Sequence, residues 1–116
     1  MKYKLINTDY LQSVSGGDKT IIAELVELFR DQISEITSEM RTLLSKGDFP
    51  SLGLLAHKAK SSVAIMGMSD LASMLKTFEL EGKDGKNREN YEGYINRYEK
   101  ESNEAVSELN DFISNM

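Results

Sequence analysis

His57 is the only histidine in the 116-residue chain, and the chain has no cysteine, so His57 is the first residue to consider for chemistry. A neutral imidazole is a good nucleophile near pH 7. Lys60, Ser61 and Ala64 follow it at helical spacing on one side of the segment. The apolar residues of the same segment share the opposite side, at Leu52, Leu55, Ala56, Ala59, Val63 and Met66. We therefore expect His57 to project from a helix away from the core; the alternative is an ordinary polar surface residue.

A short helix followed by a long one is predicted for the first part of the chain. Asn7 or Thr8 can cap the short helix over residues 9–14, and a pair of glycines then ends it. Asp18 can cap the long helix, which ends before Gly47. Its apolar positions recur every three or four residues and form one stripe, made of Ile22, Leu25, Phe29, Ile33, Ile36, Met40 and Leu43.

The next segment, which carries His57, is predicted to be the third helix. Asp48 and Pro50 suit a helix start, because a first-turn proline has no amide hydrogen bond to lose there. The helix should run to about Met66, where Gly67 breaks the pattern. A fourth helix is predicted to start at residue 69 or 70.

The glycine- and lysine-rich segment over residues 82–88 is predicted to be a loop, followed by the last helix. Apolar residues recur along that helix at Tyr91, Ile95, Tyr98, Ala105, Leu109, Phe112 and Met116. No alternating run typical of a strand occurs. The chain is therefore predicted to be one all-α domain over residues 1–116, an antiparallel four-helix bundle with a short additional N-terminal helix.

Composition argues against several classes of function. The formal net charge of −5 at pH 7 gives repulsion from a nucleic-acid backbone. No stretch approaches the ~18 apolar residues of a membrane span, and the first residues do not resemble a signal peptide. One histidine without a Glu-x-x-His or calcium-loop pattern predicts no metal site. We expect a cytoplasmic protein without nucleic-acid or membrane partners.

The stretch AHKAKSSVAIMGM resembles the signature of histidine phosphotransfer (HPt) domains of two-component phosphorelays. That signature has a histidine, a lysine three residues on, small residues just after it, and a glycine ten residues after the histidine. His57, Lys60, Ser61 and Gly67 occupy those places, whereas Ile65 stands where a polar residue is frequent. The resemblance extends to ELVELFRDQISEI, SKGDF and LKTFELEG and so covers most of the chain.

The resemblance implies that His57 carries a phosphoryl group, which agrees with the reversible chemistry of a phosphorylated imidazole. Lys60 can set an ammonium beside the phosphoryl oxygens, and Lys58 and Lys76 are weaker candidates for the same role. The alternative is that Lys60 is a solvated lysine. The small Ser61 leaves room for close approach of a partner, and the resemblance assigns Gly67 to the same region.

The family has a glutamate or glutamine that faces the imidazole from the next helix of the hairpin. Glu79, 22 residues after His57, matches that position. Its carboxylate could accept the Nδ1 hydrogen, fix the tautomer and leave Nε2 as the nucleophile. The alternative is one more surface glutamate at a helix end, beside Glu81.

The resemblance also implies that a receiver domain docks on an apolar patch that flanks the histidine. The candidate residues for that patch are Tyr10, Leu11, Val14, Met66 and Met68. Methionines adapt their shape, which suits a carrier that meets two receivers. The alternative is that Leu11 and Val14 only cap the end of the bundle.

The expected function is a phosphoryl carrier between the receiver domain of a hybrid sensor kinase and that of a response regulator. Since no nucleotide motif or kinase element is present, the chain should not phosphorylate itself from ATP. No cofactor is expected, and Mg²⁺ should belong to the receiver. We expect a monomer. The alternative function is a non-catalytic helical module that binds a receiver or another regulator without carrying phosphate.

Overall fold

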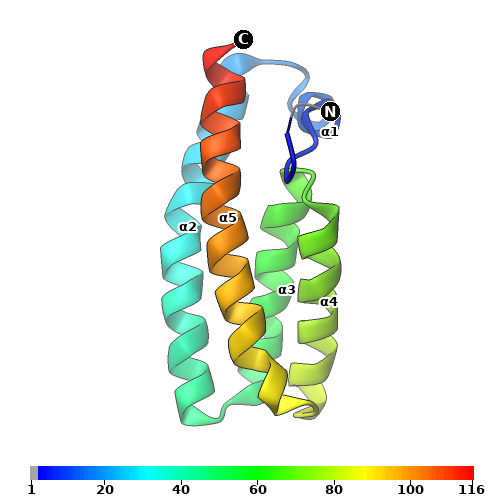
Figure 1. The fold of residues 1–116 in the computed structure, drawn as a ribbon, viewed down its shortest axis with the longest axis vertical. Helices are drawn as coiled ribbons and strands as arrows, with labels where there is room; N and C mark the ends of the chain where they lie inside the picture. The colour runs from blue at the N-terminus through cyan, green and yellow to red at the C-terminus, as the bar shows by residue number, and fades with distance from the viewer. Residues whose placement is uncertain (1–2) are drawn as a thin grey trace.

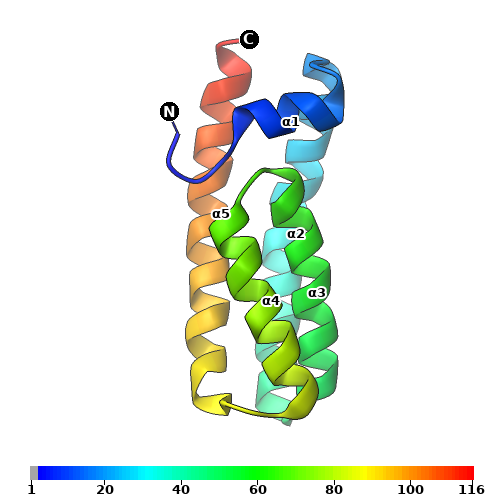
Figure 2. The same cartoon turned by 90° about the vertical axis from the view of Figure 1, so that its right-hand side faces the viewer.

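Helices account for nearly all of the computed structural model, which describes residues 3–116. In chain order they are α1 (Thr8–Ser15), α2 (Lys19–Lys46), α3 (Phe49–Ile65), α4 (Ser69–Asp84) and α5 (Tyr91–Ser114), with a short 3-10 turn, η1 (Arg88–Asn90), before α5. Helices α2 to α5 form an antiparallel bundle (Figure 1). Figure 2 shows α1 crossing the bundle beside the α3–α4 turn. The described residues contain no strand, so the predicted four-helix bundle with a short N-terminal helix is confirmed.

Three of the helices begin where an acceptor side chain precedes them. Asn7, Asp18 and Asp48 each accept hydrogen bonds from backbone amides in the first turn of α1, α2 and α3. The start of α4 at Ser69 is as expected, although no side chain caps it. Glycines in the left-handed conformation end α1, α2 and α4, at Gly16, Gly47 and Gly85.

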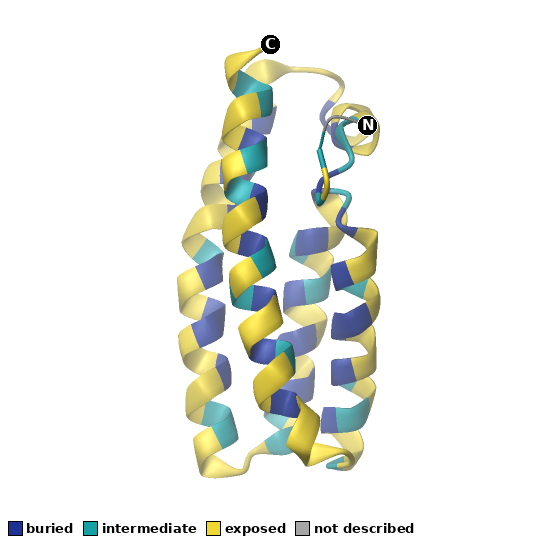
Figure 3. Cartoon of the chain, viewed as in Figure 1, coloured by how far each residue is buried: buried dark blue, intermediate teal, exposed yellow. Residues whose placement is uncertain are grey.

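The core lies between the inward faces of α2 to α5, where the buried positions form continuous bands (Figure 3). On α2 the predicted stripe is buried except for Leu25 and Leu43, which are half-buried. Val26 and Thr37, outside that stripe, are buried as well. Because α2 packs against both α3 and α5, its buried face is wider than a single row of residues.

The predicted loop over residues 82–88 is wrong in its first part. Helix α4 continues to Asp84, and Gly82 is buried inside it. A glycine this close to a helix end can mark the end or permit a close contact, and here it permits a contact with α3. The last helix starts at Tyr91, whereas Met116 lies beyond its end and is exposed.

Within residues 3–116, no helix combines the length and apolar character that crossing a bilayer requires. The predicted domain span includes residues 1 and 2, which lie outside the described residues.

Candidate functional site

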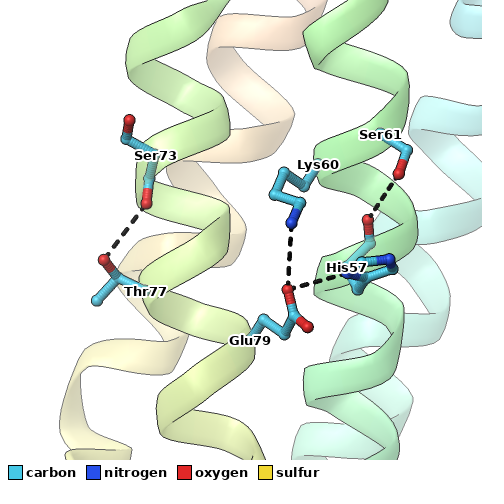
Figure 4. Close-up of polar contacts among 6 residues, drawn as sticks. All are labelled: His57, Lys60, Ser61, Ser73, Thr77 and Glu79. Carbon is cyan, nitrogen blue, oxygen red and sulfur yellow. Dashed lines mark hydrogen bonds and ion pairs between the residues drawn. The ribbon is translucent and has the colours of Figure 1, made fainter.

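His57 and Glu79 face each other across the α3–α4 hairpin (Figure 4). The imidazole Nδ1 lies 3.0 Å from Glu79 Oε1, which is hydrogen-bond distance. The side chain of His57 is 55% exposed, and that of Glu79 is 22% exposed. The other ring nitrogen, Nε2, points away from the carboxylate (Figure 4). The contact therefore occupies one ring nitrogen and leaves the other directed outward.

Lys60 adds a positive charge to the same edge of the hairpin. Its Nζ lies 3.5 Å from the Glu79 Oε1 that also contacts His57, and its side chain is 23% exposed. His57 and Lys60 are one turn apart on α3, so both approach the carboxylate from one helix. An exposed imidazole beside a shielded ammonium can hold an anionic group on its outer nitrogen.

The carboxyl group of Glu79 has a pKa below its usual value. Its partial burial acts in the opposite direction, because desolvation favours the neutral acid. The hydrogen bond from His57 and the electrostatic attraction of His57, Lys60 and Lys76 outweigh that burial and lower the pKa of Glu79. Glu79 is therefore a carboxylate at neutral pH, and a carboxylate can only accept hydrogen bonds.

Comparison with known families matches residues 24–114 to the Hpt domain. The chain belongs to the Hpt domain family. No curated protein and no solved structure matched it. Hpt domains are phosphotransfer modules of two-component systems; they carry phosphoryl groups without kinase activity and interact with receiver domains.

Three further predicted residues of this Hpt domain lie exposed near the cluster. Ser61 is one turn beyond His57, and its Oγ donates to the His57 carbonyl oxygen at 3.3 Å. Its small side chain is thus turned to its own helix. Lys76 is exposed on α4 and contributes to the lowered pKa of Glu79. Lys58 is exposed but follows His57 directly, and adjacent helical residues project in different directions.

Gly67 does not lie beside the imidazole. It follows the end of α3 at Ile65, and ten residues at the helical rise correspond to about 15 Å from His57. Its φ of +75° is in the left-handed region, and a Cβ there would lie 2.4 Å from the Cβ of Asn7. The Cβ direction of Gly67 is therefore filled by the chain's own N-terminal segment, whose Asn7 amide donates to the Met66 carbonyl oxygen. Gly67 also lines a hollow between α1 and the α3–α4 turn, so its place in the region of receiver approach stays a prediction.

The predicted docking patch is only partly at the surface. Tyr10 and Val14 are each 46% exposed on α1. Leu11, Met66 and Met68 are buried, so their assignment to an exposed patch is wrong. Leu11 lies on the inner face of α1, and the N-terminal segment covers the α3–α4 turn that carries both methionines.

Sequence reasoning missed apolar side chains that are exposed near the imidazole. Ile65 follows His57 by two helical turns, so extending the spacing from His57 through Ser61 would have found it. It lines a shallow hollow of about 110 Å³ together with Leu28 of α2. Leu54, one turn before His57, is 74% exposed. A hydrogen bond of 2.6 Å from Ser62 Oγ to Gln32 Oε1 joins α3 to α2 at this level.

Proposed function

We propose that His57 of this Hpt domain accepts a phosphoryl group from the aspartate of one receiver domain and passes it to the aspartate of another. The observation that carries the proposal is the exposed imidazole whose Nδ1 contacts Glu79, so that Nε2 is the outward nucleophile. The donor is the receiver of a hybrid sensor kinase, and the acceptor is the receiver of a response regulator.

Glu79 selects the reactive tautomer in this mechanism. When Nδ1 donates its hydrogen to the carboxylate, the free lone pair is on Nε2. As the bond from Nε2 to phosphorus forms, the bond from phosphorus to the aspartate oxygen breaks, and its electron pair stays on the aspartate. Nδ1 keeps its proton, and the carboxylate of Glu79 stabilises the positive charge that develops on the ring. Transfer to the second receiver is the reverse of these steps.

Lys60 stabilises the phosphoryl oxygens during transfer. Catalysis of phosphoryl transfer rests on positioning and on electrostatic stabilisation of these oxygens. The ammonium of Lys60 is partly shielded from water, which strengthens its attraction for an anion. Residues 3–116 hold no group of three or more His, Cys, Asp or Glu side chains suited to a metal ion. We assign Mg²⁺ to the receiver, where it would neutralise phosphoryl charge.

The receiver docks on exposed apolar residues that lie between the imidazole and the α3–α4 turn. Leu28 and Ile65 lie on the α2 side. Tyr10 and Ala64 line a second hollow, of about 330 Å³, between α1 and the α3–α4 turn. Exposed apolar groups of this kind, next to a reactive residue, are typical of a protein interaction surface.

The test is transfer from a phosphorylated receiver, with Mg²⁺, to the wild-type chain and to His57→Gln. The wild type should take up the phosphoryl group and His57→Gln should not. His57→Gln should keep the helical circular dichroism signal and the melting temperature, because the replaced side chain is more than half exposed. Equal labelling of both proteins would refute the proposal. Receiver binding without labelling of either protein would instead support the non-catalytic interaction module.

A further inference from the structure

Two glycines lie in contact where α3 packs on α4. Gly53 of α3 and Gly82 of α4 are both buried inside helices, where glycine is less favourable than alanine by about 1 kcal/mol. A Cβ on Gly53 would lie 2.8 Å from the Glu79 carbonyl oxygen and 3.0 Å from the Lys83 nitrogen. A Cβ on Gly82 would lie 3.1 Å from Gly53 Cα and from the Phe49 carbonyl oxygen. All of these neighbours are backbone atoms, so no side-chain rotation could make room.

The glycine contact adjoins the His57–Glu79 pair on both helices. Gly53 precedes His57 by one turn of α3, and Gly82 follows Glu79 by one turn of α4. The atom closest to a Cβ at position 53 is the carbonyl oxygen of Glu79 itself. Any added bulk at this contact therefore displaces the residue that contacts the imidazole.

We propose that Gly53 and Gly82 are positioning residues that set the separation of α3 and α4 so that Glu79 reaches the imidazole of His57. The importance of this spacing for transfer rests on the proposed function of His57, whereas the spacing itself does not. The glycines touch no reacting atom and act through Glu79.

The spacing leaves little tolerance. A Cβ at position 53 would lie 2.8 Å from the Glu79 carbonyl oxygen, so α3 and α4 must shift to accept an alanine there, whereas the 3.1 Å contacts at position 82 require a movement of a few tenths of an ångström. The Nδ1 to Oε1 distance is 3.0 Å, and N–H···O hydrogen bonds weaken beyond about 3.2 Å. A shift of this size is enough to loosen the contact that fixes the tautomer.

The experiment compares Gly53→Ala and Gly82→Ala with Gly93→Ala. Gly93 lies in α5 with nothing within 4 Å of its would-be Cβ, so it controls for glycine replacement as such. Gly82→Ala meets the milder contact and keeps the test open if Gly53→Ala does not fold. Circular dichroism selects the variants that keep wild-type helix content.

The first measurement is the ¹⁵N NMR spectrum of the His57 ring, which reports the tautomer without any phosphotransfer. We expect wild type and Gly93→Ala to show one tautomer protonated on Nδ1, and the two contact variants to show a mixture. An unchanged ring spectrum in folded Gly82→Ala would overturn the proposal. Absence of phosphotransfer in the wild type would refute the proposed function and leave this measurement intact.

The second measurement is the rate of transfer in the presence and absence of Glu79. Gly53→Ala and Gly82→Ala should each slow transfer by about tenfold or more, since small misplacements of a positioned group have effects of this order. In a Glu79→Ala background the same replacements should change the rate less than about twofold, because independent effects add and shared ones do not. A full additional loss in that background would mean that the glycines do not act through Glu79.

Discussion

Replacing Gly67 with alanine should destabilise the fold and leave the chemistry of the folded molecules intact. Gly67 has a φ of +75°, and a Cβ there would overlap Asn7, with 2.4 Å between the two Cβ atoms. The segment that carries Asn7 cannot move freely, because the carboxylate of Glu108 accepts hydrogen bonds from the amides of residues 4, 5 and 6. Ile6 of the same segment is buried.

The expected loss of stability is the sum of two effects. An L-residue in the left-handed region costs roughly 1–2 kcal/mol. Overpacking against a held neighbour costs roughly 1–3 kcal/mol more. Gly47→Ala isolates the backbone cost from the overpacking cost, because Gly47 has a φ of +71° and nothing lies within 4 Å of its would-be Cβ. Gly67→Ala should therefore lose about 2–5 kcal/mol, and Gly47→Ala only about 1–2 kcal/mol.

Urea unfolding followed by circular dichroism measures both free energies of unfolding. At about 4 °C per kcal/mol for a chain of this length, melting temperatures should fall by roughly 8–20 °C for Gly67→Ala and by roughly 4–8 °C for Gly47→Ala. Transfer per folded molecule should match the wild type, since the added Cβ would meet Asn7 and ten residues at the helical rise put Gly67 about 15 Å from His57. Equal destabilisation of the two variants would refute the contact with Asn7. Lost transfer in a stable Gly67→Ala protein would mean that the change reaches the receiver through the hollow that Gly67 lines.

Further predictions concern the charges and the docking surface. Lys60→Ala should slow transfer by about tenfold, measured as the rate of phosphoryl uptake from the receiver. It should change the free energy of unfolding in urea by less than about 1 kcal/mol. An unchanged transfer rate would mean that Lys60 is a solvated lysine. Glu79→Gln should be less stable than the wild type at neutral pH, and the difference should vanish as the pH falls through the lowered pKa of Glu79, because a depressed acid pKa stabilises the fold only while the acid is ionised. A stability difference between the wild type and Glu79→Gln that grows as the pH falls would contradict this expectation. Ile65→Asp should weaken receiver binding in calorimetry without changing the His57 ring spectrum, with the exposed Leu80→Asp on α4 as control.

The helices were largely predictable because their signals are local. Asn7, Asp18 and Asp48 cap helices as their side chains indicate, since a cap depends on residues within one turn. Gly82 was misread because its meaning depends on Gly53, 29 positions earlier in the chain. Glycine ends α4 at position 85, whereas at position 82, one turn earlier, glycine permits the contact with α3. Only the folded hairpin shows which of these roles each glycine has.

The candidate site was predictable where one helix or one hairpin determines it. His57 and Lys60 share a helix face, and the antiparallel α3–α4 hairpin brings Glu79 to them. The docking surface was not predictable in the same way. Burial of Met66 and Met68 depends on the path of the N-terminal segment across the α3–α4 turn, which no spacing within the hairpin encodes.

The proposed role of His57 is best tested by the position of the phosphoryl group on the phosphorylated chain. Phosphorus and nitrogen NMR of the ¹⁵N-labelled protein, after transfer from a phosphorylated receiver, identify both the residue and the ring nitrogen. We expect a single phosphoryl group on Nε2 of His57, with Nδ1 still protonated toward Glu79. A phosphoryl group on Nδ1, on another residue, or on none would contradict it.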